Sequence, residues 1–143
     1  MYKTVVFDLD GTLLNTLTDL ADAGNRLCQK YGWPTHERQA YRYFVGNGIP
    51  KLVERLAPAD QRTPAVLEAA LADFKRDYGQ HLRDTTAPYP GIPEMLAKLK
   101  ANGVQLAVFS NKADALAKEV VKDYFGTQYF TIVRGQMTGV APK

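Results

Sequence analysis

The hydrophobic pattern of the chain predicts three buried strands separated by helices. Nearly unbroken apolar runs, rich in β-branched residues, occupy residues 4–9, 104–109 and 129–133. Strands without polar alternation are typical of parallel sheets that are covered on both faces. Apolar residues at helical spacing extend from Ile92 to Gly103 and over residues 113–125. Strand and helix therefore alternate toward the end of the chain, which predicts a parallel sheet with right-handed crossovers.

The stretch that follows the first strand shows helical periodicity only. Asn15 or Thr16 is a candidate N-cap for a first helix, and Thr35 is a candidate N-cap for a second helix. The segment VGNG, residues 45–48, predicts a loop, and Pro64 begins a longer helix. This part of the chain therefore predicts a separate helical unit.

Together these patterns predict an α/β protein with a helical insertion. Residues 1–14 and 86–143 are expected to form a three-layer, Rossmann-like core around a parallel sheet, and residues 15–85 a helical cap domain. The segment APYPGIP, residues 87–93, marks the return from the insertion to the core.

Composition excludes several classes of function. The 143 residues are 45% hydrophobic, which suits one globular core with a modest insertion. The 18 Lys and Arg exceed the 15 Asp and Glu by only three, and no basic stripe with interleaved aromatic residues occurs, so nucleic-acid binding is not expected. No apolar run is long enough to cross a bilayer, and MYKTVV shows no signal-peptide pattern. We therefore expect no membrane partner and a cytoplasmic location.

The lone cysteine, Cys28, rules out an internal disulfide. It lies in a helical pattern, where a half-buried apolar role is the simplest interpretation. A catalytic thiol would need a histidine nearby in the fold, and both His36 and His81 lie in segments typical of a polar helix surface. A thiol enzyme is therefore a minor alternative.

The segment DLDGT places two carboxylates, Asp8 and Asp10, at the carboxyl end of the first strand. Ligands bind at this end of the strands in open parallel sheets. Two like charges so close need a counter-charge, and Mg²⁺ prefers carboxylate and phosphate oxygens. We therefore expect both aspartates to bind Mg²⁺. Gly11 would let backbone N–H groups approach an anion, and we assign Gly11 and Thr12 to substrate binding. The alternative is an aspartate-rich turn that only caps a helix.

Carboxylate chemistry suggests a division of labour between these two residues. Asp8 can attack phosphorus and form an acyl phosphate, as carboxylate nucleophiles do. Asp10 can protonate the leaving oxygen and then deprotonate the water that cleaves the intermediate.

The segment DLDGTLL, residues 8–14, resembles the first signature of the haloacid dehalogenase superfamily of phosphatases. The resemblance implies that Asp8 is the nucleophile and that Asp10 is the acid and base, whose backbone carbonyl also binds Mg²⁺. True dehalogenases of the superfamily lack the second aspartate, so Asp10 points to phosphate ester chemistry.

The second strand ends in AVFSNK, residues 107–112, and resembles the second signature of the same superfamily. The implied role of Ser110, with Asn111, is to hold phosphate oxygens. The tripeptide SNK and the preceding PYPG run are similar to the phosphoglycolate phosphatase-like branch. The alternative, compatible with this role, is that Ser110 or Asn111 is the N-cap of the following helix.

Lys143, in the final APK, looks like the third signature, a lysine that neutralises the nucleophile and the phosphate. The alternative is a solvated terminal lysine. The fourth signature, an acidic pair on a further strand that supplies another Mg²⁺ ligand, is missing. We therefore expect a truncated form that binds Mg²⁺ weakly and turns over poorly. Because the missing strand would lie beside the first one, a bare sheet edge that could self-associate is also expected.

The insertion resembles the helical cap of the family, and its loop of Gly46, Asn47 and Gly48 is expected to face the substrate. The leading hypothesis is a Mg²⁺-dependent phosphatase of a small, phosphoglycolate-like monoester that forms an aspartyl-phosphate intermediate. Two alternatives stay open. One is a phosphosugar mutase of the same superfamily, and the other is a truncated binding module with little catalysis.

Overall fold

The computed structural model describes residues 3–137, and the chain divides into two compact units. Residues 1–15 and 87–143 belong to the first unit, and residues 16–86 belong to the second.

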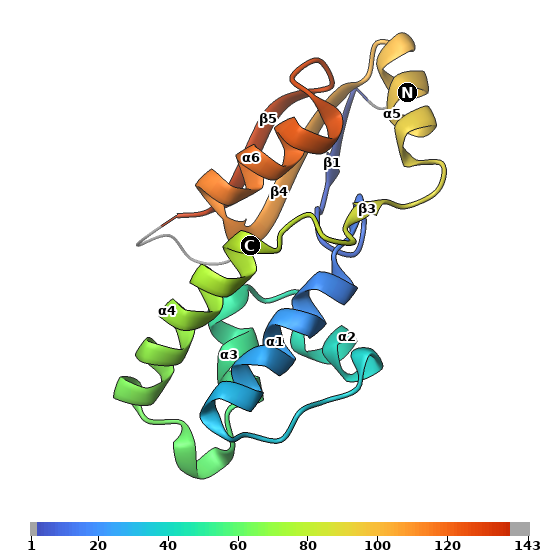
Figure 1. Ribbon diagram of the computed structural model, residues 1–143. Coiled ribbons are helices and arrows are strands. Elements are labelled where there is room, and N and C mark those ends of the chain that lie inside the picture. The colour runs from blue at the N-terminus through green and yellow to red at the C-terminus, as the bar shows by residue number, and fades with distance from the viewer. Residues whose placement is uncertain (1–2, 138–143) are drawn as a thin grey trace. The chain divides into compact units, whose positions relative to one another are not determined.

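The first unit contains the predicted parallel sheet (Figure 1). Its strands are β1 (Thr4–Phe7), β4 (Gln105–Ala113) and β5 (Phe130–Gln136), in the order β1-β4-β5. All three predicted strands are therefore present, although β1 ends two residues early and β4 and β5 extend further than the apolar runs. The register sets Phe7 of β1 opposite Val108 of β4.

The described part of this unit also contains two helices, α5 (Ile92–Ala101) and α6 (Asp114–Phe125). The chain passes from β1 to β4 and then to β5, so it crosses the sheet twice in the same direction. Because such crossovers are right-handed, both helices lie on the same face of the sheet. The core accordingly joins Leu106 and Val108 of β4 with Leu96 of α5 and with Val120 of α6. The predicted Rossmann-like fold with a parallel sheet is confirmed. Residues 3–137 form the sheet and one layer of helices.

The opposite face of the sheet keeps apolar side chains at the surface. Val6 is 55% exposed, Phe109 40% and Ile132 48%, and the register sets Val6 and Ile132 on either side of Ala107. The expectation that the first strand is covered on both faces is therefore wrong for the described residues. The reason is topological, because α5 and α6 lie on the other face.

The second unit is a helical bundle. Its elements are α1 (Leu17–Tyr31), a 3-10 turn at Arg38–Ala40, α2 (Tyr41–Phe44), α3 (Ile49–Leu56), a 3-10 turn at Ala59–Gln61 and α4 (Pro64–Gln80). Tyr41, Phe74 and Tyr78 are its largest fully buried side chains. The last of these helices begins as predicted, with Thr63 accepting a hydrogen bond from the amide of Val66 at 3.3 Å.

The predicted helix start at Thr35 is wrong, because a side chain of α1 satisfies the backbone there. Asn25 accepts a hydrogen bond from the amide of His36 at 3.0 Å and donates to the carbonyl of His36 at 2.8 Å. An asparagine that satisfies a loop backbone in this way competes with helix formation. Regular structure resumes only at Arg38.

A short antiparallel pair of strands, which the sequence did not predict, joins two segments of the chain. One segment leaves the first unit and the other returns to it. β2 (Leu14–Asn15) pairs with β3 (Ala87–Pro88), with Asn15 opposite Ala87. The amide of Tyr89 adds a hydrogen bond to the carbonyl of Leu13 at 3.3 Å. The ends of the insertion are therefore held together on the side of the first unit.

Asp19 of α1 holds the same two ends together within the second unit. Its carboxylate is buried and accepts hydrogen bonds from the amides and hydroxyls of Thr85 and Thr86 at 2.7–3.0 Å. Burial acts to raise the pKa of Asp19, but the hydrogen bonds from Thr86 and Thr85 outweigh it and hold this pKa below the ordinary value of 3.8. Thr16 is the N-cap residue of α1, but its side chain makes no capping bond.

Replacing Asp19 by Asn should lower the free energy of unfolding by about 2 kcal/mol, since an amide cannot accept from every donor that converges on this carboxylate. The contribution of Asp19 is present above its unfolded-state pKa and is lost as the pH falls through its lower folded-state pKa. The difference between wild type and variant should therefore be constant near pH 6 and should shrink as the pH falls below about 4. Urea titration measures it, with Asp22→Asn, exposed on the same helix, as control. A constant difference across this pH range would contradict the prediction.

Replacing Val6 by Lys should reduce self-association of the chain. Within the described residues β1 pairs on one side only, with β4, and Val6 is exposed on the uncovered face. A charge on an open edge strand disfavours pairing with another chain. Sedimentation velocity at rising protein concentration measures the effect. Tyr43→Lys is the control, because Tyr43 is an exposed apolar residue of the helical unit, and equal effects of both variants would contradict a role for the sheet.

Candidate active site

Asp8 and Asp10 directly follow β1, on either side of the completely buried Leu9. Leu9 anchors the segment in the core, while both aspartates are half-buried. The carboxylate of Asp8 accepts a hydrogen bond from the amide of Leu9 at 2.8 Å through Oδ1. This bond orients the carboxylate that the sequence predicts to be a nucleophile.

A tight turn follows the aspartates and uses the conformational freedom of Gly11, whose φ is +80°. The amide of Gly11 donates to the carbonyl of Leu14 at 2.9 Å, and the amide of Thr12 donates to the carbonyl of Leu9 at 3.3 Å. Both residues are exposed, but their N–H groups already have backbone acceptors. Their assignment to substrate binding stays a prediction. In this conformation, such binding would have to use atoms of the turn other than these two N–H groups.

Ser110 lies inside β4, two residues beyond the point that the register sets opposite the end of β1. Its side chain is buried, and its Oγ accepts a hydrogen bond from the amide of Lys112 at 3.0 Å. The hydroxyl keeps its own proton as a donor. The alternative that Ser110 or Asn111 is an N-cap is wrong, because β4 continues and the N-cap residue of α6 is Ala113.

Close packing against β5 explains why β4 continues this far. A Cβ atom on Gly135 would collide with the carbonyl oxygen of Lys112 and the backbone of Asp114. The amide of Gly135 donates to Oδ1 of Asp114 at 2.9 Å, and this hydrogen bond, followed by that from Lys118, lowers the pKa of Asp114. The end of β4 is therefore fixed from the β5 side.

Lys112 also lies in this region. In the sequence it contributed only to the SNK tripeptide, and no role was predicted for it. Its side chain is 2% exposed, and its Nζ lies 3.4 Å from Oδ2 of Asp10. Lysine is almost never fully buried without a charged partner. A lysine at the end of an apolar strand was the available signal, but the sequence does not show which way the side chain points.

The other oxygen of Asp10, Oδ1, is buried and has no hydrogen-bond partner among the described residues. A buried carboxylate oxygen without a donor is costly, so a cation or a proton donor fits this position. Asp8 and Asp10 offer the hard oxygen atoms that Mg²⁺ prefers. No group of three or more His, Cys, Asp and Glu side chains gathers within residues 3–137. Bound Mg²⁺ would therefore depend on waters and phosphate oxygens for its other ligands.

The described structure does not test the remaining predicted site residues. Lys143 lies outside the described residues. Gly46, Asn47 and Gly48 belong to the second unit, where Gly46 and Gly48 have positive φ angles and separate α2 from α3. That this loop faces the substrate stays a prediction.

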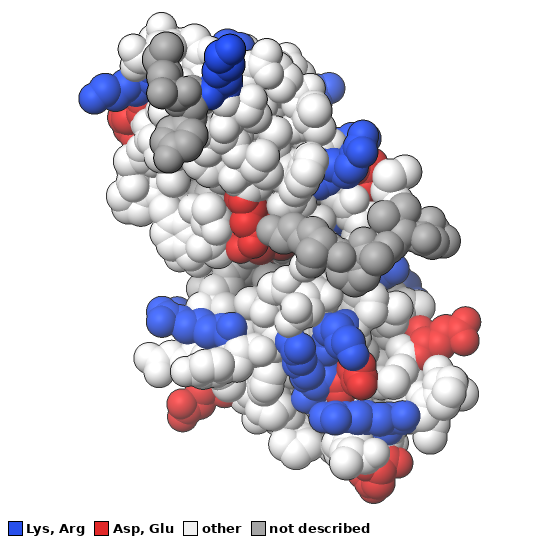
Figure 2. Space-filling model, turned by 180° about the vertical axis from the view of Figure 1, so that it is seen from behind, with Lys and Arg blue, Asp and Glu red and all other residues white. Residues whose placement is uncertain are grey.

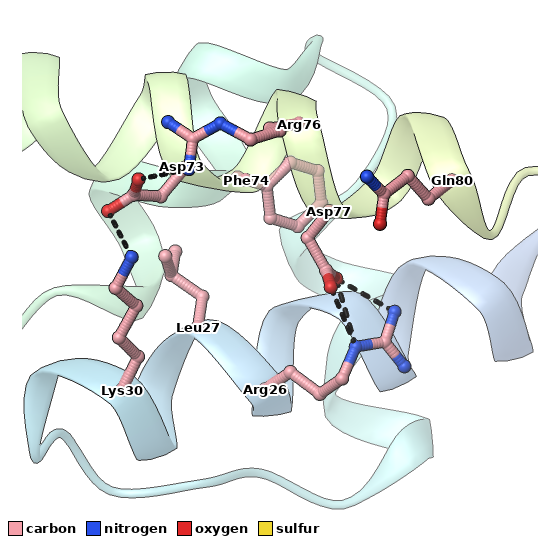
Figure 3. A pocket seen from close by; sticks show the side chains of 8 residues that line it. All are labelled: Arg26, Leu27, Lys30, Asp73, Phe74, Arg76, Asp77 and Gln80. Carbon is pink, nitrogen blue, oxygen red and sulfur yellow. Dashed lines mark hydrogen bonds and ion pairs between the residues drawn. The ribbon is translucent and has the colours of Figure 1, made fainter.

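The second unit has a hollow of its own, of about 220 Å³, between α1 and α4. Figure 3 shows that its charged side chains point toward one another. Oδ2 of Asp73 lies 3.1 Å from Nζ of Lys30, and its Oδ1 lies 3.0 Å from Nη1 of Arg76. Oδ2 of Asp77 lies 2.8 Å from Nη2 of Arg26. The pairs of Lys30 with Asp73 and of Arg26 with Asp77 join α1 to α4, so we assign the hollow a structural role.

Other features of the described structure limit the alternatives. Cys28 is completely buried, and burial raises the pKa of its thiol to about 11, which does not suit a nucleophile. Figure 2 shows basic side chains in small groups, several of them next to acidic ones, and no continuous basic surface on the visible face. None of the helices within residues 3–137 is long and apolar enough to span a membrane.

Comparisons with known proteins agree with this geometry. The chain is 34% identical over 134 residues to a phosphoglycolate phosphatase of Thiobacillus denitrificans and 36% identical over 134 residues to one of Nitrosospira multiformis. These matches cover 92% of the chain and 59% of each relative. A crystal structure from Lactobacillus delbrueckii, named as a candidate phosphoglycolate phosphatase, superposes with a TM-score of 0.91 at 28% identity, covering 99% of this chain and 68% of that one.

A family model described as haloacid dehalogenase-like hydrolase matches residues 5–143, which includes both aspartates, Ser110 and Lys143. The chain spans 59% of the length of the two bacterial relatives. With the parallel sheet and the paired aspartates at the end of its first strand, this match shows that the chain belongs to the haloacid dehalogenase-like hydrolases.

Proposed function

We propose that the chain carries the catalytic aspartates of a Mg²⁺-dependent phosphatase that hydrolyses a small, phosphoglycolate-like monoester. The observation that supports this most directly is the placement of Asp8 and Asp10 after β1 and of Ser110 on the adjacent strand β4. The proposed nucleophile, the proposed acid and the hydroxyl that would donate a hydrogen bond to the phosphate then lie at one end of one sheet. The phosphoglycolate phosphatase relatives favour the substrate class.

In the first step the carboxylate of Asp8 attacks phosphorus, and an oxygen–phosphorus bond forms to the aspartate. The bond between phosphorus and the alcohol oxygen of the substrate breaks, and Asp10 transfers a proton to that oxygen. The hydroxyl of Ser110 donates a hydrogen bond to a phosphoryl oxygen. When bound, Mg²⁺ would draw electron density from the phosphoryl oxygens and offset the charge of the two carboxylates.

In the second step a water molecule attacks the aspartyl phosphate. Asp10, now a carboxylate, takes the proton of the water, and the acyl phosphate bond breaks to release inorganic phosphate and the free carboxylate of Asp8. One aspartate thereby serves as acid and then as base, which returns both residues to their starting states.

The proposed location is the cytoplasm, where a buried, unpaired cysteine such as Cys28 stays reduced.

Replacing Asp8 by Asn should lower phosphate release at least about 10³-fold, because the amide is a poor nucleophile toward phosphorus. Malachite green detection of inorganic phosphate from 2-phosphoglycolate measures this loss. Asp60→Asn makes the same chemical change at an exposed position of the helical unit and should leave the rate unchanged. Phosphate release by Asp8→Asn at the wild-type rate would contradict the nucleophile assignment. It would favour the interpretation of the chain as a binding module.

Mg²⁺ should bind this chain weakly, with a dissociation constant above about 1 mM, since ligands from Asp8 and Asp10 alone leave most ligand positions to water. Isothermal titration calorimetry measures the affinity, and Asp8→Asn, which removes a charged carboxylate, should weaken it further. Orthophosphate should strengthen binding of Mg²⁺ to the wild type, because its oxygens would supply additional ligands. Micromolar binding of Mg²⁺ alone would show a more complete ligand set than we propose.

A further inference from the structure

We infer that Lys112 is a positioning residue, which holds one oxygen of Asp10 so that the other is directed to the proton that moves. This inference rests on the proposed function. Nζ of Lys112 lies 3.4 Å from Oδ2 of Asp10, whereas Oδ1 is buried without a hydrogen-bond partner among the described residues. With one oxygen held by the ammonium, proton transfer to the leaving alcohol and from the attacking water falls to Oδ1.

The backbone of Lys112 is fixed on two sides, which fixes the point from which its side chain leaves β4. Its amide donates to Oγ of Ser110 at 3.0 Å, and its carbonyl oxygen packs against Gly135 of β5. The side chain is 2% exposed, against 57% for Lys118, whose ammonium pairs with Asp114 one helical turn away. A buried ammonium needs its counter-charge far more than an exposed one does. The ammonium of this pair is therefore buried, unlike that of Lys118, while the side chain of Asp10 is 21% exposed.

The burial of Lys112 also gives the carboxylate a defined rotation. The terminal torsion of an aspartate is broad and roughly two-fold, so an unpaired carboxylate interchanges its oxygens easily. A buried cation on one side removes this freedom. Asp10 then uses the same oxygen, the buried Oδ1, in both chemical steps, as an acid that also serves as the base requires.

The test compares Lys112→Met with Lys118→Met, the same chemical change at the exposed lysine of α6. Two substrates are used with the full chain, 2-phosphoglycolate and p-nitrophenyl phosphate. The alkyl leaving group needs a proton from Asp10, whereas p-nitrophenolate leaves without one. Lys112→Met should lower kcat/KM about 100-fold for 2-phosphoglycolate and less than about fivefold for the aryl ester. Lys118→Met should change neither value.

Equal losses for the two esters would overturn the inference, because they would indicate a direct contact with the phosphoryl group or general damage to the site. Unchanged values for both esters would also overturn it. In either case the proposed function would stand, since the wild type would still release phosphate. A wild-type chain that releases phosphate from neither ester would instead overturn the proposed function, and with it the inference.

A second measurement does not depend on turnover. Urea titration of the wild type, Lys112→Met, Asp10→Asn and the double variant gives a double-mutant cycle for the pair. The inference predicts coupling, with the double variant more stable than the sum of the two single losses implies, because no buried charge is left unpaired. Additive losses would overturn the pairing of Lys112 with Asp10. Circular dichroism spectra of all four proteins establish that each one folds.

Discussion

The parallel pairing of β1 with β4 is the constraint on which the candidate site depends. Its register sets Phe7 opposite Val108, so the residues that continue each strand lie at the same end of the sheet. Asp8 and Asp10 follow β1, and Ser110 and Lys112 lie in the last part of β4. A slip of one residue would turn the apolar side chains of β1 away from the core and would separate Asp10 from Lys112. Packing of the sheet therefore also sets the geometry of the site.

The site contains the polar groups that a core built only for stability would avoid. Lys112 is a charged residue inside a strand, and Oδ1 of Asp10 is buried without a described partner. Such local conflicts are tolerated where the surrounding structure determines them and where function requires them. Here the surroundings include Gly135, which packs against the backbone of β4, and Leu9, which is buried between the two aspartates.

The helical insertion interrupts the sheet without disturbing its register, because its two ends are tied together. β2 and β3 pair within the first unit, and Asp19 receives the backbone and side-chain donors of Thr85 and Thr86 within the second. Long insertions add little free-energy cost once their ends are held close to each other. Each unit consequently keeps its own core, as a domain does.

The sequence by itself determined the order of strands and helices, the place of the insertion and the identity of the paired aspartates. These follow from apolar runs, helical spacing and the DLDGT segment, all of which are local patterns. Local patterns were insufficient where a distant partner decided the outcome. Asn25 delayed the helix expected after Thr35, β5 prolonged β4 through Ser110, and the crossovers left Val6 exposed. Only the tertiary structure paired Lys112 with Asp10, because the direction of a side chain at a strand end depends on its neighbours across the sheet.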